Sequence, residues 1–171
     1  TVFENLRAIY EPYNYSRKIV GFDTFEGYPE ISINDKESEI INVGNYKLEN
    51  GYEDFLIELV DYHEKENVMK HIKKHEIVKG DILKTFPLWL KNNPSSVFSL
   101  LYLDVALYEP TKNILENAIE RLMPGGVIVF DEFNNENYPG ETKAVLETLD
   151  FDKFLVSKSK FLPDRVIFQK K

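Results

Sequence analysis

The chain has 171 residues and a net charge of -8 at pH 7, and 43% of its residues are hydrophobic. This composition is typical of one globular domain, and the negative charge disfavours nucleic acid or an anionic membrane surface as the main partner. The absence of cysteine excludes disulfides, thiolate metal sites and cysteine nucleophiles. No apolar run reaches the roughly 20 residues of a membrane span and no signal-peptide pattern opens the chain, so we expect a cytoplasmic enzyme domain.

The first part of the chain predicts a helix, a strand and a long polar loop. Residues 2–10 have apolar side chains at helical spacing and are stopped by Pro12, and 18–23 read as a buried strand. Residues 30–50 show no sustained period and are predicted to be a surface loop. A helix follows over 50–63, with Asn50 and Glu53 as a capping box. We expect residues 30–70 to be an insertion that forms a lid.

The remainder alternates between strands and helices. The predicted strands are 75–81, 97–103, 127–130, 154–157 and 165–169, and the predicted helices are 82–90, 108–122 and 141–149. Such alternation predicts one α/β domain with parallel strands, right-handed crossovers and helices on both faces of the sheet.

Four of the predicted strands end in acidic residues, which are Asp23, Asp81, Asp104 and the pair Asp131 and Glu132. The carboxyl ends of parallel strands meet at one edge of the sheet, where open α/β folds bind ligands. A single strand-end aspartate is more often a helix cap or a turn residue, but four such strands favour a functional edge. An acid after an early strand suits the hydroxyls of a ribose, and the last three carboxylates together suit a divalent ion such as Mg²⁺.

Four segments carry a family resemblance, namely Phe22–Pro29 (FDTFEGYP), Tyr102–Lys112 (YLDVALYEPTK), Pro124–Glu132 (PGGVIVFDE) and Tyr138–Val145 (YPGETKAV). In this order they resemble the macrocin O-methyltransferase (TylF-like) family. Its members are S-adenosylmethionine-dependent, Mg²⁺-assisted O-methyltransferases with a Rossmann-like class I fold. The resemblance implies methylation of a sugar or phenolic hydroxyl on a small-molecule or glycan acceptor, in glycan or secondary-metabolite biosynthesis, by a protein that tends to form homo-oligomers.

The resemblance also implies roles for individual residues. The cofactor-binding candidates are Asp23, which would face the ribose, Thr24, and Asp81 with Ile82 beside the adenine. The catalytic candidates are Asp104 and Asp131, and the metal ligands would be Asp104, Asp131 and Glu132. A metal-bound hydroxyl loses its proton more easily and is held in line with the sulfonium methyl group.

The chain departs from the family pattern at the expected general base. Family members usually read Asp-x-Asp after the central strand, whereas Ala106 stands at the second position and cannot accept a proton. Glu132 is one methylene longer than the usual aspartate. Tyr108 or Glu109 is an alternative base, although Glu109 also suits the N-terminus of a helix, where the dipole favours an acid.

The family's first strand and its Gly-rich turn, which hold the methionine part of the cofactor, would precede Thr1. We therefore expect the chain to be incomplete at its N-terminus and the sheet to lack its middle strand. Two other functions are considered. One is a non-catalytic binding or assembly module with the same fold, and the other is a metal-dependent glycosyltransferase, which the four motifs disfavour.

The remaining candidates carry weaker signals. His71 and His75 have a metal-compatible i, i+4 spacing, but the strand that begins at His75 disfavours a ligand pair. The lysines at 70, 73 and 74 are predicted to form a solvated face. Arg165 could contact an anionic substrate group, although a surface arginine is the more common case.

Overall fold

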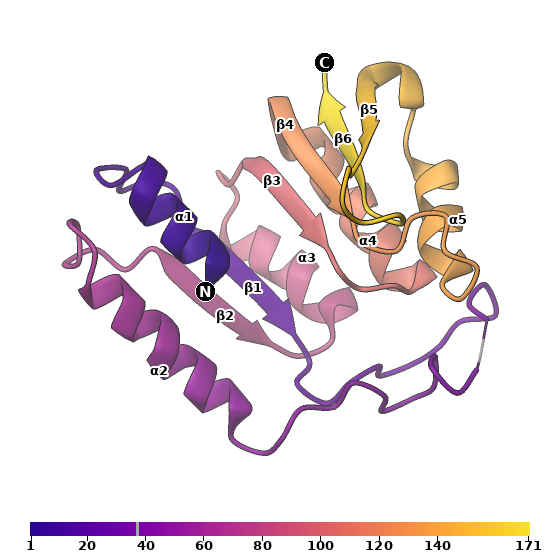
Figure 1. The fold of residues 1–171 in the computed structure, drawn as a ribbon, viewed down its shortest axis with the longest axis horizontal. Coiled ribbons are helices and arrows are strands. Elements are labelled where there is room, and N and C mark those ends of the chain that lie inside the picture. The colour runs from indigo at the N-terminus through magenta and orange to yellow at the C-terminus, as the bar shows by residue number, and fades with distance from the viewer. Residues whose placement is uncertain (37) are drawn as a thin grey trace.

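Strands and helices alternate along the chain, as predicted (Figure 1). The computed structural model describes residues 1–36 and 38–171. Its helices are α1 (Val2–Tyr10), α2 (Tyr52–Lys65), α3 (Ile82–Asn92), α4 (Tyr108–Ala118) and α5 (Pro139–Thr148), and its strands are β1 (Ile19–Asp23), β2 (His75–Lys79), β3 (Phe98–Leu103), β4 (Leu122–Phe130), β5 (Phe154–Lys158) and β6 (Val166–Lys170). None of the helices in this part of the chain is long and apolar enough to cross a membrane.

The strands form two sheets. β1 and β2 pair in parallel, from Ile19 opposite His75 to Asp23 opposite Lys79. The second sheet has the order β3-β4-β6-β5, in which β3 and β4 are parallel and the two C-terminal strands are antiparallel. Among the described residues β1 pairs only with β2 and β3 only with β4, so each keeps one free edge. The two sheets are separated between β1 and β3, which is where the family resemblance places a further strand.

The main core lies on one face of the larger sheet, under α3, α4 and α5. Alternate strand residues point into it, and its fully buried members include Ile128, Phe130 and Phe168 of the sheet and Leu115 and Val145 of the helices. Burying one such side chain stabilises the fold by roughly 1.5–3 kcal/mol. On the opposite face, α1 contacts α2 and places Phe3 against Tyr102 of β3, with ring centres 5.6 Å apart. The predicted covering of both faces by helices is confirmed.

Helix α1 has the predicted bounds, but its apolar stripe is not its buried face. Val2 and Ile9 are 67% and 69% exposed, whereas Glu4 and Arg7 are buried and paired with each other. The prediction of a solvated lysine face holds for Lys70 and Lys73, which are exposed, but is wrong for Lys74, which is fully buried in the same charge cluster. Its Nζ atom pairs with a buried glutamate of α2 and donates to two backbone carbonyls of the preceding turn.

The start of α2 and the end of α4 differ from the prediction in ways that have a physical reason. The capping box at Asn50 and Glu53 does not form, because Gly51 is the N-cap of α2 in a left-handed conformation (φ 86°) and Glu53 instead pairs with Lys79 at 2.6 Å. The helix predicted over 108–122 ends at Ala118, and a short 3-10 turn over Ile119–Arg121 leads directly into β4. Leu122 is therefore the first residue of β4, and β4 is longer than predicted.

Candidate active site

The acidic strand ends lie at one end of the two sheets, which Figure 1 shows as the end toward which β1, β2 and β3 all point. Asp23 is the last residue of β1, Asp104 follows β3 and Asp131 follows β4. Asp23 and Asp104 are exposed, whereas Asp131 is half-buried. The fold therefore presents several carboxylates at the edge where α/β sheets bind ligands.

The side chains of Asp23 and Thr24 shape the turn that follows β1. One carboxylate oxygen of Asp23 accepts a hydrogen bond from the backbone N–H of Phe25 at 2.7 Å. The Thr24 hydroxyl donates to the carbonyl of Gly27 at 2.7 Å. Both residues thus hold local structure, and their roles at a cofactor stay predictions.

Asp81 and Ile82 lie at the start of α3. Asp81 is the N-cap, and its carboxylate accepts from the backbone N–H of Leu83 at 3.0 Å. This is the common structural use of a strand-end aspartate. Ile82 packs against the main core. Their place beside an adenine stays a prediction, and the helix start also offers backbone N–H donors to a ligand.

Glu132 belongs to a carboxylate cluster that the sequence did not reveal. Its Oε2 atom accepts from the Asn135 amide at 2.7 Å, and the same amide donates to Asp164 at 3.0 Å. Burial, followed by the negative charge of Asp164, raises the pKa of Glu132. Because Asp164 comes from the loop before β6, only the folded chain brings these two acids together.

Glu141 lies behind this cluster and is fully buried. Its Oε1 atom accepts from the backbone N–H of Glu132 at 2.9 Å, and its Oε2 atom has no hydrogen-bond partner among the residues that the structure describes. Burial raises the pKa of Glu141 to about 8, and the charges of Glu132, Asp104 and Asp164 act in the same direction. Glu141 therefore carries a proton at neutral pH.

Asp131 is turned toward a cation of its own chain. Its carboxylate forms an ion pair with Arg165 and accepts from the Tyr102 hydroxyl at 2.9 Å. The Arg165 guanidinium also lies over the Tyr102 ring, 5.7 Å from its centre. The sequence left the role of Arg165 open, and the structure places it at this strand end rather than on a free surface.

The predicted metal ligands do not form a tight group. Within the described residues, the one set of three acidic or histidine side chains whose ligand atoms lie within 4.8 Å of one another is Glu4, Glu64 and His75. That set lies at the amino end of β2, and Arg7 and Lys74 neutralise its carboxylates. Asp104, Asp131 and Glu132 fit Mg²⁺ in the chemistry of their oxygens, but the ion pair with Arg165 occupies Asp131.

The alternative bases have other contacts. The Tyr108 hydroxyl donates to Glu147 at 2.5 Å and accepts from Lys112 at 2.9 Å, so it is held between α4 and α5. Glu109 is exposed in the first turn of α4, as expected for an acid at a helix N-terminus. Ala106 is 5% exposed and has a left-handed backbone with φ 57°.

The connection between β1 and α2, described over residues 24–36 and 38–51, crosses this edge. Figure 1 shows it running from the end of β1 to the vicinity of α5 and back to α2. Asp35 accepts from the backbone N–H of Tyr108 at 2.8 Å and so caps α4 from a distant segment. The predicted loop over 30–50 has this course, although Glu37 lies outside the described residues. Whether residues 30–70 act as a lid stays a prediction.

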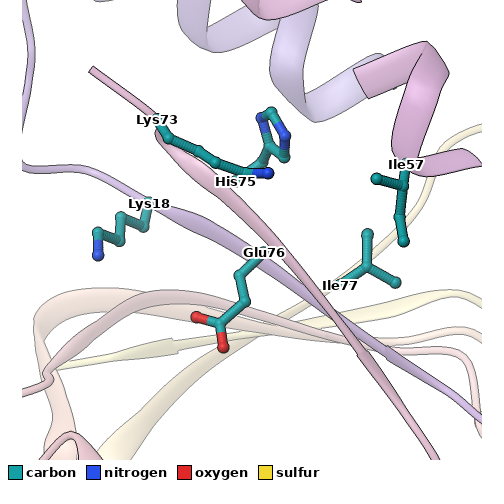
Figure 2. Close-up of a pocket in the computed structure, with 6 residues that line it drawn as sticks. All are labelled: Lys18, Ile57, Lys73, His75, Glu76 and Ile77. Carbon is teal, nitrogen blue, oxygen red and sulfur yellow. The ribbon is translucent and has the colours of Figure 1, made fainter. Parts of the chain in front are cut away.

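A separate hollow of about 370 Å³ lies at the amino ends of β1 and β2, away from the acidic edge (Figure 2). Figure 2 shows His75 and Glu76 projecting in opposite directions from the strand. His75 bonds to Asp61 at 2.8 Å and Glu76 accepts from the Trp89 indole at 3.1 Å. The side chains of His75 and Glu76 therefore have partners already and do not converge on a ligand.

Comparisons with known proteins identify the family. The crystal structure of CalS11, a calicheamicin methyltransferase, is 36% identical with a TM-score of 0.92, and the match covers 98% of this chain and 65% of that one. The O-methyltransferase NovP shares the fold, with a TM-score of 0.71 at 18% identity over 99% of this chain and 66% of that one. A 4'-O-methyltransferase from Streptomyces olivaceus, which acts on 8-demethyl-8-(2,3-dimethoxy-alpha-L-rhamnosyl)-tetracenomycin C, is 27% identical over 126 residues, 69% of this chain and 42% of that protein.

The chain thus spans less than two thirds of the length of these relatives. A family model described as a methyltransferase domain matches residues 6–133, which is more than half of the chain. The fold agrees with this match. The structures of CalS11 and NovP superpose on nearly the whole of this chain, its sheets and its covering helices included. The chain belongs to the methyltransferase domain family and has its Rossmann-like class I fold.

Proposed function

We propose that the protein is an S-adenosylmethionine-dependent O-methyltransferase that methylates a sugar hydroxyl in the biosynthesis of a glycosylated metabolite. The likeness to CalS11 carries this proposal, because it extends over 98% of the chain at 36% identity. An apo structure of CalS11 is described as a TDP-rhamnose 3'-O-methyltransferase. The Streptomyces olivaceus relative is named for methylation of a rhamnosyl group. Because both relatives are named for rhamnose or a rhamnosyl group, we propose that this protein methylates a deoxysugar, either free or linked to a nucleotide.

The proposed cofactor site lies at the ends of β1 and β2. Asp23 would bind the ribose hydroxyls, and Asp81 and Ile82 would border the adenine. The free edges of β1 and β3 support the further proposal that a strand supplied from outside these 171 residues lies between them. A Gly-rich turn after that strand would hold the methionine part of the cofactor.

Mg²⁺ is part of the proposal because Asp104 and Glu132 offer the carboxylate oxygens that this ion prefers. When bound, such an ion lowers the pKa of a hydroxyl that it holds. Burial and the neighbouring charge of Asp164 make the ionised form of Glu132 costly. A cation bound beside Glu132 would offset this cost. Asp131 would join the ligands only by giving up Arg165.

A titration of the full-length protein with S-adenosylhomocysteine, with and without Mg²⁺, tests the cofactor proposal. We expect binding in both conditions, and methylated product by mass spectrometry when S-adenosylmethionine and TDP-rhamnose are supplied with Mg²⁺. Asp104→Asn should abolish turnover and keep S-adenosylhomocysteine binding, whereas Glu116→Gln, which changes an exposed acid on α4, should change neither. No binding of S-adenosylhomocysteine by the full-length protein would refute the proposal.

A second candidate function rests on Ala106. The residue stands where related enzymes carry a proposed base, and its methyl group can neither accept a proton nor bind a metal. The chain would then be a binding or assembly module with a methyltransferase fold. Binding of S-adenosylhomocysteine and TDP-rhamnose without any methyl transfer would favour this function, and turnover by the unaltered protein would exclude it.

A further inference from the structure

Three tyrosines, two from the β1–α2 connection and one from the start of α5, contact one another. The rings of Tyr28 and Tyr46 lie edge to face, with centres 5.4 Å apart and an angle of 68° between their planes. The Tyr46 and Tyr138 hydroxyls are hydrogen-bonded at 2.8 Å. Tyr28 and Tyr46 belong to the β1–α2 connection and Tyr138 is the N-cap of α5, so the cluster joins the two sides of the edge.

Backbone contacts hold Tyr28 and Tyr46 in place. The N–H of Tyr28 donates to the carbonyl of Asn45, and the N–H of Gly44 donates to the carbonyl of Tyr28, at 3.1 and 2.9 Å. Gly27 has φ 77°, and a Cβ atom there would lie 2.1 Å from the Asn45 carbonyl oxygen. Only glycine permits this close approach, so the FEGYP sequence positions the ring of Tyr28.

The tyrosine cluster lies next to Glu132, because the N–H of Tyr138 donates to the carbonyl of Asn135 at 3.1 Å and the Asn135 amide donates to Glu132 at 2.7 Å. Tyr28 is half-buried, and burial raises its pKa, with the charges of Tyr46, Glu132 and Asp104 adding to the effect. Burial likewise raises the pKa of Tyr138, followed by its hydrogen bond to Tyr46. The charges of Glu132 and Asp104 therefore act on Tyr28, and the charge of Glu132 also acts on Tyr138.

We propose that Tyr28, Tyr46 and Tyr138 form the subsite that binds the sugar ring of the acceptor and orients its hydroxyl toward Asp104. This inference rests on the proposed function and adds the residues that select the acceptor. A sugar ring has an apolar C–H face that packs on an aromatic ring, and hydroxyls that bond to phenols. A few polar groups on an aromatic wall are a common design of small-molecule sites.

Binding measurements on the full-length protein test this inference. TDP-rhamnose is titrated by calorimetry in the presence of saturating S-adenosylhomocysteine, and S-adenosylhomocysteine is titrated alone. Tyr28→Leu keeps an apolar side chain in the half-buried position but removes the ring, and it should weaken TDP-rhamnose binding at least tenfold. Tyr28→Phe keeps the ring and should weaken it less than threefold. Both variants should bind S-adenosylhomocysteine within twofold of the unaltered protein.

Tyr62→Leu is the control for the same substitution outside the cluster, because Tyr62 lies on α2 and is exposed. It should leave both affinities unchanged. The inference is overturned if Tyr28→Leu binds TDP-rhamnose as the unaltered protein does, if it loses both ligands equally, or if the unaltered protein binds S-adenosylhomocysteine but not TDP-rhamnose. Failure of the unaltered protein to bind S-adenosylhomocysteine refutes the proposed function instead.

Discussion

Glu141 makes a strong prediction about pH and stability. Its carboxyl is fully buried and has a pKa of about 8, against 4.5 for an unperturbed glutamate. Below pH 4.5 the group is protonated in both the folded and the unfolded chain and adds no pH dependence. Between pH 4.5 and 8 the unfolded chain releases this proton while the folded chain keeps it, so stability falls as pH rises. Above pH 8 the loss is complete.

The size of the effect follows from the difference between the two pKa values. Each pKa unit corresponds to about 1.4 kcal/mol, so the loss across this window is roughly 4–5 kcal/mol. Glu141→Gln removes the titrating group but keeps an oxygen that accepts from the Glu132 N–H. The variant should lack this loss and should be more stable than the unaltered protein at pH 8.

Urea unfolding of the full-length protein at half-unit steps from pH 5 to 8.5, with EDTA present, measures this effect. The free-energy difference between Glu141→Gln and the unaltered protein should widen steadily with pH. Glu147→Gln is the control on the same helix, because the Tyr108 hydroxyl lowers the pKa of Glu147 and it stays ionised throughout this range. A difference between Glu141→Gln and the unaltered protein that does not change with pH would refute the reasoning.

Three other changes test the edge of the sheet. Gly27→Ala should lower the free energy of unfolding, measured in urea, by about 2–4 kcal/mol, because the new Cβ atom would meet the Asn45 carbonyl oxygen. Gly44→Ala is the control: Gly44 also has a positive φ of 82°, but its Cβ atom would meet no described atom, so the change should cost about 1 kcal/mol. Arg165→Gln should free Asp131 and tighten Mn²⁺ binding, measured by electron paramagnetic resonance, roughly two- to fivefold, and unchanged affinity would remove Asp131 from the ligands. Ala106→Asp should raise turnover by roughly 100-fold or more, and an unchanged rate would show that this position needs no base.

Most of the fold could be predicted because its elements carry local signals. Apolar periodicity and the position of Pro110 located α4, and the short apolar run that ends in Asp23 located β1. The errors occurred where a distant contact decided the outcome. Lys74 is buried because Glu64, ten residues earlier, turns toward it, and the capping box failed because Glu53 pairs with Lys79. Neither partner can be chosen from spacing alone.

The candidate site shows the same limit more strongly. Strand ends predicted the positions of Asp104, Asp131 and Glu132, because parallel strands share an edge. The groups that set their chemistry come from remote loops, namely Arg165 on Asp131 and Asp164 beside Glu132. Arg165 was considered only as a possible contact of an anionic substrate group, and Asp164 lies in the connection before the last predicted strand, so no sequence pattern paired either residue with its carboxylate.

The conformation of Ala106 bears on whether the chain is an enzyme. Left-handed backbone costs an alanine roughly 1–2 kcal/mol, whereas glycine adopts it freely and aspartate or asparagine tolerates it more often. The turn at φ 57° is therefore better suited to an aspartate than to the residue it holds. The backbone at this position could present an aspartate two residues after Asp104, while alanine supplies no proton-accepting group. Ala106→Asp therefore allows two effects to be measured separately. Unfolding in urea reports the cost of the left-handed backbone, and turnover reports the contribution of a proton acceptor at this position.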